Sequence, residues 1–177
     1  MDCQACGLGN NRTNMVFGRG NINAPVLFVG EGPGEQEDIQ GVPFVGAAGQ
    51  LLDTLFEALS FKSDEYYIAN VVKCRPPNNR VPTDNEAEKC LPYLRNQVAL
   101  IRPRIIVCLG SIAARYIIAK DVKISQIRGQ WVEKKGVMIM PTFHPAALLR
   151  DQSKRALLFR DIKEVKNKMI TIKNHKG

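Results

Sequence analysis

The segment Val26–Asp53, which reads VLFVGEGPGEQEDIQGVPFVGAAGQLLD, decides the fold. Its first four residues are apolar and predict a buried strand. The glycines and the proline of residues 30–34 break regular structure and predict a loop. Leucines at helical spacing then predict an amphipathic helix over residues 47–60. This order places the loop at the carboxyl end of a strand, where open α/β sheets bind their ligands.

The loop is acidic, with carboxylates at Glu31, Glu35, Glu37 and Asp38. It is not a phosphate loop, because no Lys-Ser or Lys-Thr pair follows its glycines. A dinucleotide fingerprint begins at Gly30 and Gly32, but Glu35 stands where the third glycine belongs. An acidic surface loop with ordinary turn glycines is the alternative. Phe44, which lies between Pro43 and Val45, fits that alternative poorly.

Strand and helix patterns alternate along the rest of the chain. Strands are predicted at 24–30, 65–72 and 105–109, and a hairpin at 131–140 with Lys135 and Gly136 in its turn. Further helices are predicted after a cap at Asp84 or Asn85, after a cap at Ser111, and over 152–168. The alternation predicts one α/β domain, a three-layer α/β/α sandwich around a mostly parallel sheet of about four strands. It spans residues 1–168, and a basic tail follows at 169–177.

Composition is that of an ordinary soluble protein, with 45% apolar and 24% charged residues in 177. No apolar run approaches the roughly 18 residues that span a bilayer. The N-terminus has no basic region followed by an apolar region, so no secretory signal is expected. We therefore expect a cytoplasmic protein without a membrane partner.

The net charge of +8 is concentrated at the C-terminus, where nine Lys and Arg residues from Arg150 onward face three acids. A basic stripe of this kind is the footprint of a polyanion-binding surface. A solvated helix face with a lysine-rich tail would give the same pattern. Charge therefore permits a nucleic-acid partner without establishing one.

Five cysteines are present, and four of them, Cys3, Cys6, Cys74 and Cys90, are candidate metal ligands. Cys108 lies in an apolar strand pattern and is expected to be a buried structural thiol. Four thiolates suit tetrahedral zinc or an iron–sulfur cluster. One C-x-x-C pair with two isolated cysteines favours the cluster, because a zinc ribbon brings two such pairs. A redox C-x-x-C motif is the weaker alternative, since no strand precedes Cys3.

His144 and Asn70 both lie where a predicted strand gives way to a loop, as the acidic loop does. The three strand ends are expected to meet at one edge of the sheet. A lone histidine is more often a surface or core residue, but this placement weakens that interpretation. An amide, an aromatic face and an imidazole together suit recognition of a planar heterocycle such as a pyrimidine. With a nearby carboxylate they suit cleavage of a flipped base from its sugar.

Four segments carry a family resemblance: GEGPGEQED, GVPFVGAAGQLLD, IANVVKCRPPNNR and HPAALLR. In this order they resemble the family 4 uracil-DNA glycosylases, the iron–sulfur members of that superfamily. The resemblance runs from about Cys3 to about Lys168, nearly the whole chain. It implies that the four candidate cysteines hold a [4Fe-4S] cluster, with residues 1–12 as a cluster-binding arm. The expected substrate is uracil-containing DNA, single- or double-stranded, and the expected state is a monomer.

The resemblance also implies roles for individual residues. Phe44 would stack on the extruded uracil, and Asn70 would read its edge. His144 would stabilise the leaving anion, with Glu31 as the catalytic carboxylate. Further implied site residues are Gly32, Pro33, Glu37 and Asn79 for the substrate, and Arg75, Arg80 and Arg150 for DNA. Glu37 is expected near C5 of the base, and the basic C-terminal helix is expected to hold phosphates.

The implied reaction is monofunctional hydrolysis of the uracil N-glycosidic bond in base excision repair. No lysine within the motifs offers a Schiff-base nucleophile, so strand nicking is not expected. Two alternatives stay open at this point. One is a non-enzymatic nucleic-acid-binding module with a four-cysteine metal site, and the other is a glycosylase for a different damaged base.

Overall fold

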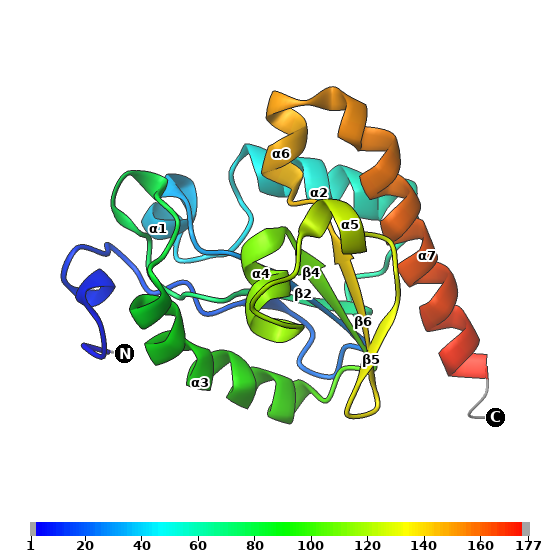
Figure 1. Ribbon diagram of the computed structural model, residues 1–177, viewed down its shortest axis with the longest axis horizontal. Coiled ribbons are helices and arrows are strands. Elements are labelled where there is room, and N and C mark those ends of the chain that lie inside the picture. Colours follow the sequence, from blue (N-terminus) through cyan, green and yellow to red (C-terminus); the bar gives the residue numbers. More distant parts are fainter. Residues whose placement is uncertain (1–2, 175–177) are drawn as a thin grey trace.

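The computed structural model describes residues 3–174, which form three layers around a six-stranded sheet (Figure 1). The strand order is β1-β3-β2-β4-β6-β5. The four inner strands are mutually parallel: β3 (Tyr66–Asn70), β2 (Val26–Gly30), β4 (Ile105–Leu109) and β6 (Val137–Thr142). The two edge strands are antiparallel to their neighbours: β1 (Arg19–Gly20) and β5 (Val132–Lys134).

Helices cover both faces of the sheet. One face carries α3 (Asp84–Ile101), α4 (Ser111–Ile117) and α5 (Ile124–Ile127). The other carries α2 (Ala47–Ala58), α6 (Pro145–Arg150) and α7 (Arg155–Asn174). Successive side chains of a strand enter opposite cores, so Leu27 packs on the α3 side and Phe28 on the α2 side. Burial on both faces explains why the inner strands read as continuous apolar runs.

The predicted mostly parallel α/β sandwich is confirmed, with six strands instead of about four. The additional strand β1 is only two residues long, too short for periodicity to reveal. β5 and β6 form the predicted hairpin, with Lys135 and Gly136 between them.

Two segments that were expected to be loops contain short helices. In the acidic loop, α1 (Glu35–Gln40) begins after Gly34 and ends at Gly41, whose φ of 72° is left-handed. The glycines thus flank the helix and do not interrupt it. After His144, Pro145 is the first residue of α6, a position that its fixed φ favours. Three 3-10 turns complete the described elements: η1 (Gly7–Asn10), η2 (Pro77–Asn79) and η3 (Gln152–Lys154).

Both predicted helix caps were wrong by one or two residues. Thr83, not Asp84 or Asn85, caps α3 and forms a capping box with Glu86. Ser111 is the first residue of α4, and Gly110 occupies the cap position.

The C-terminal helix also departs from its predicted bounds. α7 begins at Arg155 and continues to Asn174, past the expected boundary at 168, because Met169 is buried in the core. Residues 1–2 and 175–177 lie outside the described part of the chain. Among residues 3–174, no helix combines the length and the apolar character needed to cross a membrane.

Candidate active site

A pocket of about 590 Å³ opens at the edge of the sheet where the parallel strands end. Its size is typical of small-molecule sites. Predicted site residues that line it are Glu31, Gly32, Pro33, Glu37, Phe44, Asn70, Asn79, Arg80, His144 and Arg150. Of the residues predicted to touch substrate or DNA, only Arg75 is not part of its wall. The structure therefore brings together side chains from four separate segments of the chain.

Phe44 is held in the pocket by a strained backbone. Its φ of 56° is left-handed, which is uncommon for a bulky residue. α2 begins just after it, and a Cβ on Gly49 would lie 1.9 Å from the Phe44 carbonyl oxygen. The Glu37 carboxylate accepts hydrogen bonds from the backbone N–H groups of Val45 (2.9 Å), Gly46 (2.8 Å) and Gly34 (3.1 Å). Glu37 therefore stabilises the loop that holds the Phe44 ring in the pocket. This structural role is additional to the predicted position of Glu37 near C5 of the base.

Asn70 ends β3 with only 2% of its surface exposed. Its Oδ1 is buried and has no hydrogen-bond partner among residues 3–174. Gly30 lies opposite it in the neighbouring strand, where a Cβ would come within 2.5 Å of Asn70 Oδ1 and 2.7 Å of Phe44 Cζ. Glycine at that position lets the amide and the aromatic ring approach each other. A buried acceptor without a partner is costly, so this oxygen is suited to a donor on a ligand.

His144 follows β6 and caps α6. Its Nδ1 accepts the Ala146 N–H at 3.1 Å, so in the neutral ring the proton is on Nε2. Burial lowers the pKa of His144 to about 4, which keeps the imidazole neutral at physiological pH. The ring stacks against Phe44 with centroids 5.5 Å apart. The imidazole is thus a fixed, uncharged hydrogen-bond donor at the pocket wall.

Of the four acids in the loop, Glu31, Glu35 and Glu37 line the pocket. Burial raises the pKa of Glu31, which lies just beyond β2. Glu35 is exposed and pairs with Arg75 at 3.3 Å. Asp38 is buried and accepts hydrogen bonds from the backbone of Thr13 and Asn14, so it ties α1 to the N-terminal arm. Glu31 is the carboxylate whose side chain is available for chemistry.

The three arginines predicted to bind DNA differ in their surroundings. Arg80 makes two hydrogen bonds to the Glu86 carboxylate, at 2.7 and 2.8 Å, and holds the pKa of that acid at about 2. Arg75 donates to Asn79 Oδ1 at 2.8 Å, which gives Asn79 a supporting contact. Arg150 is exposed at the end of α6, on the pocket rim. Arg150 is therefore the best placed of the three to meet a phosphate.

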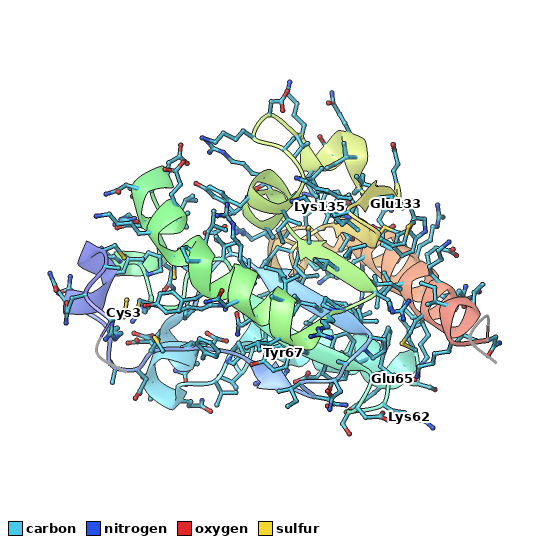
Figure 2. The ribbon with its side chains drawn as sticks, turned by 90° about the horizontal axis from the view of Figure 1, so that it is seen from below. Cys3, Lys62, Glu65, Tyr67, Glu133 and Lys135 are labelled. Atoms are coloured by element: carbon cyan, nitrogen blue, oxygen red, sulfur yellow. The ribbon has the colours of Figure 1, made fainter. Side chains whose placement is uncertain are left out.

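The basic C-terminal helix does not present all of its charge near the pocket. Lys166 and Lys173 both pair with the buried Glu65. Burial alone would raise the pKa of Glu65, but hydrogen bonds from Lys166 and the Lys62 amide hold it at about 2. α7 begins beside α6 and runs away from it (Figure 1), and Figure 2 shows Lys62 and Glu65 together near its far end. These two lysines hold α7 to Glu65, which directly precedes β3, and direct their charge at that carboxylate.

The four candidate cysteines line one hollow between the N-terminal arm, the β3–α3 connection and α3. Cys74 and Cys90 are buried, and Cys3 lies beside α3 (Figure 2). Hydrogen-bond donors face three of the sulfurs: Arg12 Nη1 to Cys74 (3.4 Å), the Lys73 amide to Cys90 (3.3 Å) and the Tyr93 hydroxyl to Cys3 (3.2 Å). Burial raises the pKa of Cys90 to about 11, so its thiolate requires a strong positive charge nearby.

Within residues 3–174, no group of three or more His, Cys, Asp or Glu side chains is arranged to hold a metal ion. The four-sulfur donor set around one hollow, with N–H and O–H groups directed at three of the sulfurs, fits the chemistry of an iron–sulfur cluster, in which each iron takes one thiolate.

Two residues at or beside the site were missed by the sequence analysis. One is Ser111, which lines the pocket. Ser111 follows a strand end, a signal that was available but was interpreted only as a helix cap. Lys73 is buried between Asn70 and the cysteines, and nothing in its local sequence distinguishes it from a surface lysine.

Comparisons with known proteins agree with this geometry. The family model described as the uracil DNA glycosylase superfamily matches residues 17–168. A type-4 uracil-DNA glycosylase of Thermotoga maritima is 46% identical over 169 residues, covering 93% of this chain and 88% of its own. Proteins of the same name from Sulfurisphaera tokodaii and Archaeoglobus fulgidus are 44% and 43% identical, covering 99% and 93% of this chain and 84% and 87% of their own.

Proposed function

The chain belongs to the type-4 uracil-DNA glycosylases of the uracil-DNA glycosylase superfamily, and we propose that it excises uracil from DNA as a monofunctional hydrolase. The reaction breaks the bond between N1 of uracil and C1′ of the deoxyribose and adds water to C1′. An abasic site and free uracil result. The proposed partner is uracil-containing DNA, and the proposed location is the cytoplasm.

The unpartnered Oδ1 of Asn70 is the observation that supports this function most strongly. Uracil carries an N–H at N3 beside the carbonyl oxygen O4. A carboxamide can accept from the first with Oδ1 and donate to the second with Nδ2. Cytosine has no N3–H and carries an amino group in place of O4. At both positions it therefore presents the opposite of the donor or acceptor that the Asn70 amide requires. Phe44, next to Asn70 across Gly30, offers the aromatic surface on which the flipped base would stack.

His144 would act at the opposite carbonyl of the base. As the N1–C1′ bond breaks, its electron pair passes to the uracil ring and negative charge grows on O2. The neutral imidazole would donate its Nε2–H to that oxygen, with the ring orientation set by the Ala146 N–H on Nδ1. A donor that is already in place gains most where charge develops, which stabilises the transition state more than the bound substrate.

Glu31 would work on the sugar side. Its carboxylate can orient the attacking water and stabilise the positive charge that develops at C1′. Gly32 and Pro33 line the same wall, and a Cβ on Gly32 would come within 2.6 Å of Val72 Cγ2. The site therefore separates its charges: a carboxylate faces the cationic sugar, and a neutral donor faces the anionic base.

The acid limb of the pH–rate profile should report Glu31. Activity requires Glu31 ionised and His144 neutral, so the rate falls as pH decreases through either pKa. Burial raises the pKa of Glu31 above the ordinary 4.5, whereas that of His144 is lowered to about 4, so Glu31 is protonated first. We expect a single acid limb above pH 4.5, measured as kcat/KM by single-turnover assays. The variant Glu31→Gln should be slower and should lack this limb; a variant that keeps it would contradict the assignment.

We further propose that Cys3, Cys6, Cys74 and Cys90 hold a [4Fe-4S] cluster that pins the N-terminal arm. Three independent segments meet at the hollow, so a covalent connection there removes conformational freedom from the unfolded chain. When bound, the cluster would supply four strong iron–thiolate bonds that connect the N-terminal arm to the β3–α3 connection and to α3. Its proposed role is structural, since the hollow and the active-site pocket share none of their lining residues.

Replacing Cys74 by alanine should therefore lower the stability of the fold more than it lowers the rate of uracil release by the folded protein. We expect loss of iron and of visible absorbance, and a thermal midpoint lowered by about 10 °C or more. The matched control is Cys108→Ala, which removes a fully buried thiol in β4, outside the hollow, and should keep its iron. A Cys74→Ala protein without iron but with the wild-type midpoint and rate would show that the cluster has no structural role.

Release of free uracil tests the proposed function against a binding module. The protein, purified without air, is incubated with an oligonucleotide containing one uracil and with its thymine counterpart. We expect uracil release from the first only, and a strand break only after alkali. No release by a folded, brown protein would contradict the uracil assignment. Binding without release of any base would favour the non-enzymatic module.

A further inference from the structure

Lys73 lies between the active-site pocket and the cysteine hollow and is 1% exposed. Its ammonium donates to the main-chain carbonyl of Asn70 at 2.8 Å and to Gln97 Oε1 at 2.5 Å. Gln97 in turn donates to the carbonyl of Phe17, whose ring lies 5.6 Å from the ammonium. Lys73 thus forms a hydrogen bond to the main chain of Asn70, the residue whose side chain is proposed to recognise the base.

The surroundings of this ammonium are short of negative charge. Both of its acceptors are uncharged, and no carboxylate within residues 3–174 forms a salt bridge with it. A buried cation without a counter-charge is strongly destabilising. Cysteine sulfurs are groups that could supply one: Lys73 lines the same hollow as the four cysteines, its backbone N–H donates to Cys90 Sγ at 3.3 Å, and Cys74 is the next residue.

We propose that Lys73 is a positioning residue that couples the cysteine cluster to uracil recognition. Its ammonium takes its compensating negative charge from the cluster thiolates and uses its protons to fix the end of β3 at Asn70. The part of this inference that concerns uracil recognition rests on the proposed function. The part that concerns the compensating charge rests on the four-cysteine site. Together they predict that events at the cysteines are transmitted to the pocket through one side chain.

The geometry at the end of β3 makes this coupling effective. Asn70 has one rigid neighbour on its strand edge, Gly30, whose carbonyl accepts the Val71 N–H at 2.9 Å. The Asn70 carbonyl is held by Lys73 from the α3 side, where Gln97 lies. A small rotation of this peptide would move the carboxamide relative to Phe44 and His144. Lys73 therefore controls the orientation of the Asn70 carboxamide, on which its hydrogen bonds to the base depend.

The first test replaces Lys73 by methionine, which keeps the length and removes the charge. The control is Lys89→Met, at an exposed lysine that lines the same hollow. Three quantities are measured: loss of visible absorbance in a chelator, hydrogen exchange of the peptide covering 66–72, and binding of radiolabelled uracil by equilibrium dialysis. For Lys73→Met we expect faster cluster loss, faster exchange and uracil affinity lower by about tenfold or more. Lys89→Met should match wild type in all three.

A second variant tests the charge directly and does not depend on Lys73→Met folding. Gln97→Glu places a carboxylate where the ammonium already has a neutral acceptor, at the cost of the Nε2–H that Gln97 donates to the Phe17 carbonyl. The lysine then has a counter-charge of its own. After chelation, exchange at 66–72 should rise less in Gln97→Glu than in wild type. An equal rise would overturn the part of the inference that concerns the compensating charge.

The outcomes separate this inference from the proposed function. Faster cluster loss in Lys73→Met with wild-type exchange and uracil affinity would overturn the coupling and leave the lysine as a counter-ion only. Wild-type behaviour in all measurements would overturn the inference entirely. If wild-type protein binds no uracil, the proposed function fails, and cluster retention and exchange still report whether Lys73 connects the two sites.

Discussion

Replacing His144 by alanine should lower the rate of uracil release by about 10²- to 10³-fold, the usual cost of removing one preorganised donor at a developing oxyanion. The imidazole is neutral, its proton is directed by the Ala146 N–H, and its pKa of about 4 keeps it neutral over the working pH range. Affinity for uracil-containing DNA should change little, because this hydrogen bond strengthens in the transition state. Single-turnover release and equilibrium DNA binding measure the two quantities separately.

A graded series distinguishes the electronic role of His144 from simple packing against Phe44. His144→Gln retains an N–H donor of similar reach and should recover part of the loss, whereas His144→Leu fills the space without a donor and should not. Lys135→Ala, in the exposed hairpin turn between β5 and β6, serves as an unrelated control. Equal rates for the glutamine and leucine variants would mean that the donor does not contribute. An unchanged rate of uracil release in His144→Ala would show that His144 does not stabilise the leaving base.

Replacing Asn70 by leucine should reduce kcat/KM for uracil-containing DNA by about 10²-fold or more, because a site built to pair polar edges loses both hydrogen bonds at once. Leucine is close in size, so the pocket wall is preserved. The affinity of the protein for free uracil should also fall, since the hydrogen bonds of Asn70 to the edge of the base do not depend on the DNA. Equilibrium dialysis with labelled uracil measures this directly.

Asn79→Leu is the matched control for this change. Asn79 is the other asparagine of the pocket wall, but it is exposed and its Oδ1 already accepts from Arg75. We expect a loss of less than about tenfold, the scale of one exposed hydrogen bond. If Asn70→Leu and Asn79→Leu lower kcat/KM by similar factors, Asn70 does not have the recognition role proposed for it.

Much of this architecture could be predicted from local patterns. Apolar runs of four and five residues placed β2 and β4 within two residues of their bounds, because strands buried on both faces are apolar throughout. Topology then placed Asn70 and His144 together, since the carboxyl ends of parallel strands share one edge. Glu31 and Phe44 entered the same pocket because they follow the first of those strands.

Pairing partners far apart in sequence could not be predicted in this way. Arg80 and Lys166, which lies in the basic helix predicted over 152–168, were both expected to face DNA, yet they are paired with Glu86 and Glu65, and no local signal encodes those pairings. The bracing role of Glu37 depends on a left-handed Phe44, which only the packing of α2 explains. Lys73 is the clearest case, because burial of a lysine is a tertiary property and its neighbours in sequence give no sign of it.

A structure of this protein with bound uracil tests the central claim most directly. We predict uracil in the pocket at the carboxyl ends of the strands, with its N3–H donating to Asn70 Oδ1, its O2 accepting from His144 Nε2, and its ring against Phe44. The Asn70 oxygen would then have the partner that it lacks in the free protein. Uracil bound elsewhere, or bound in this pocket with Asn70 Oδ1 still unpaired, would contradict the account.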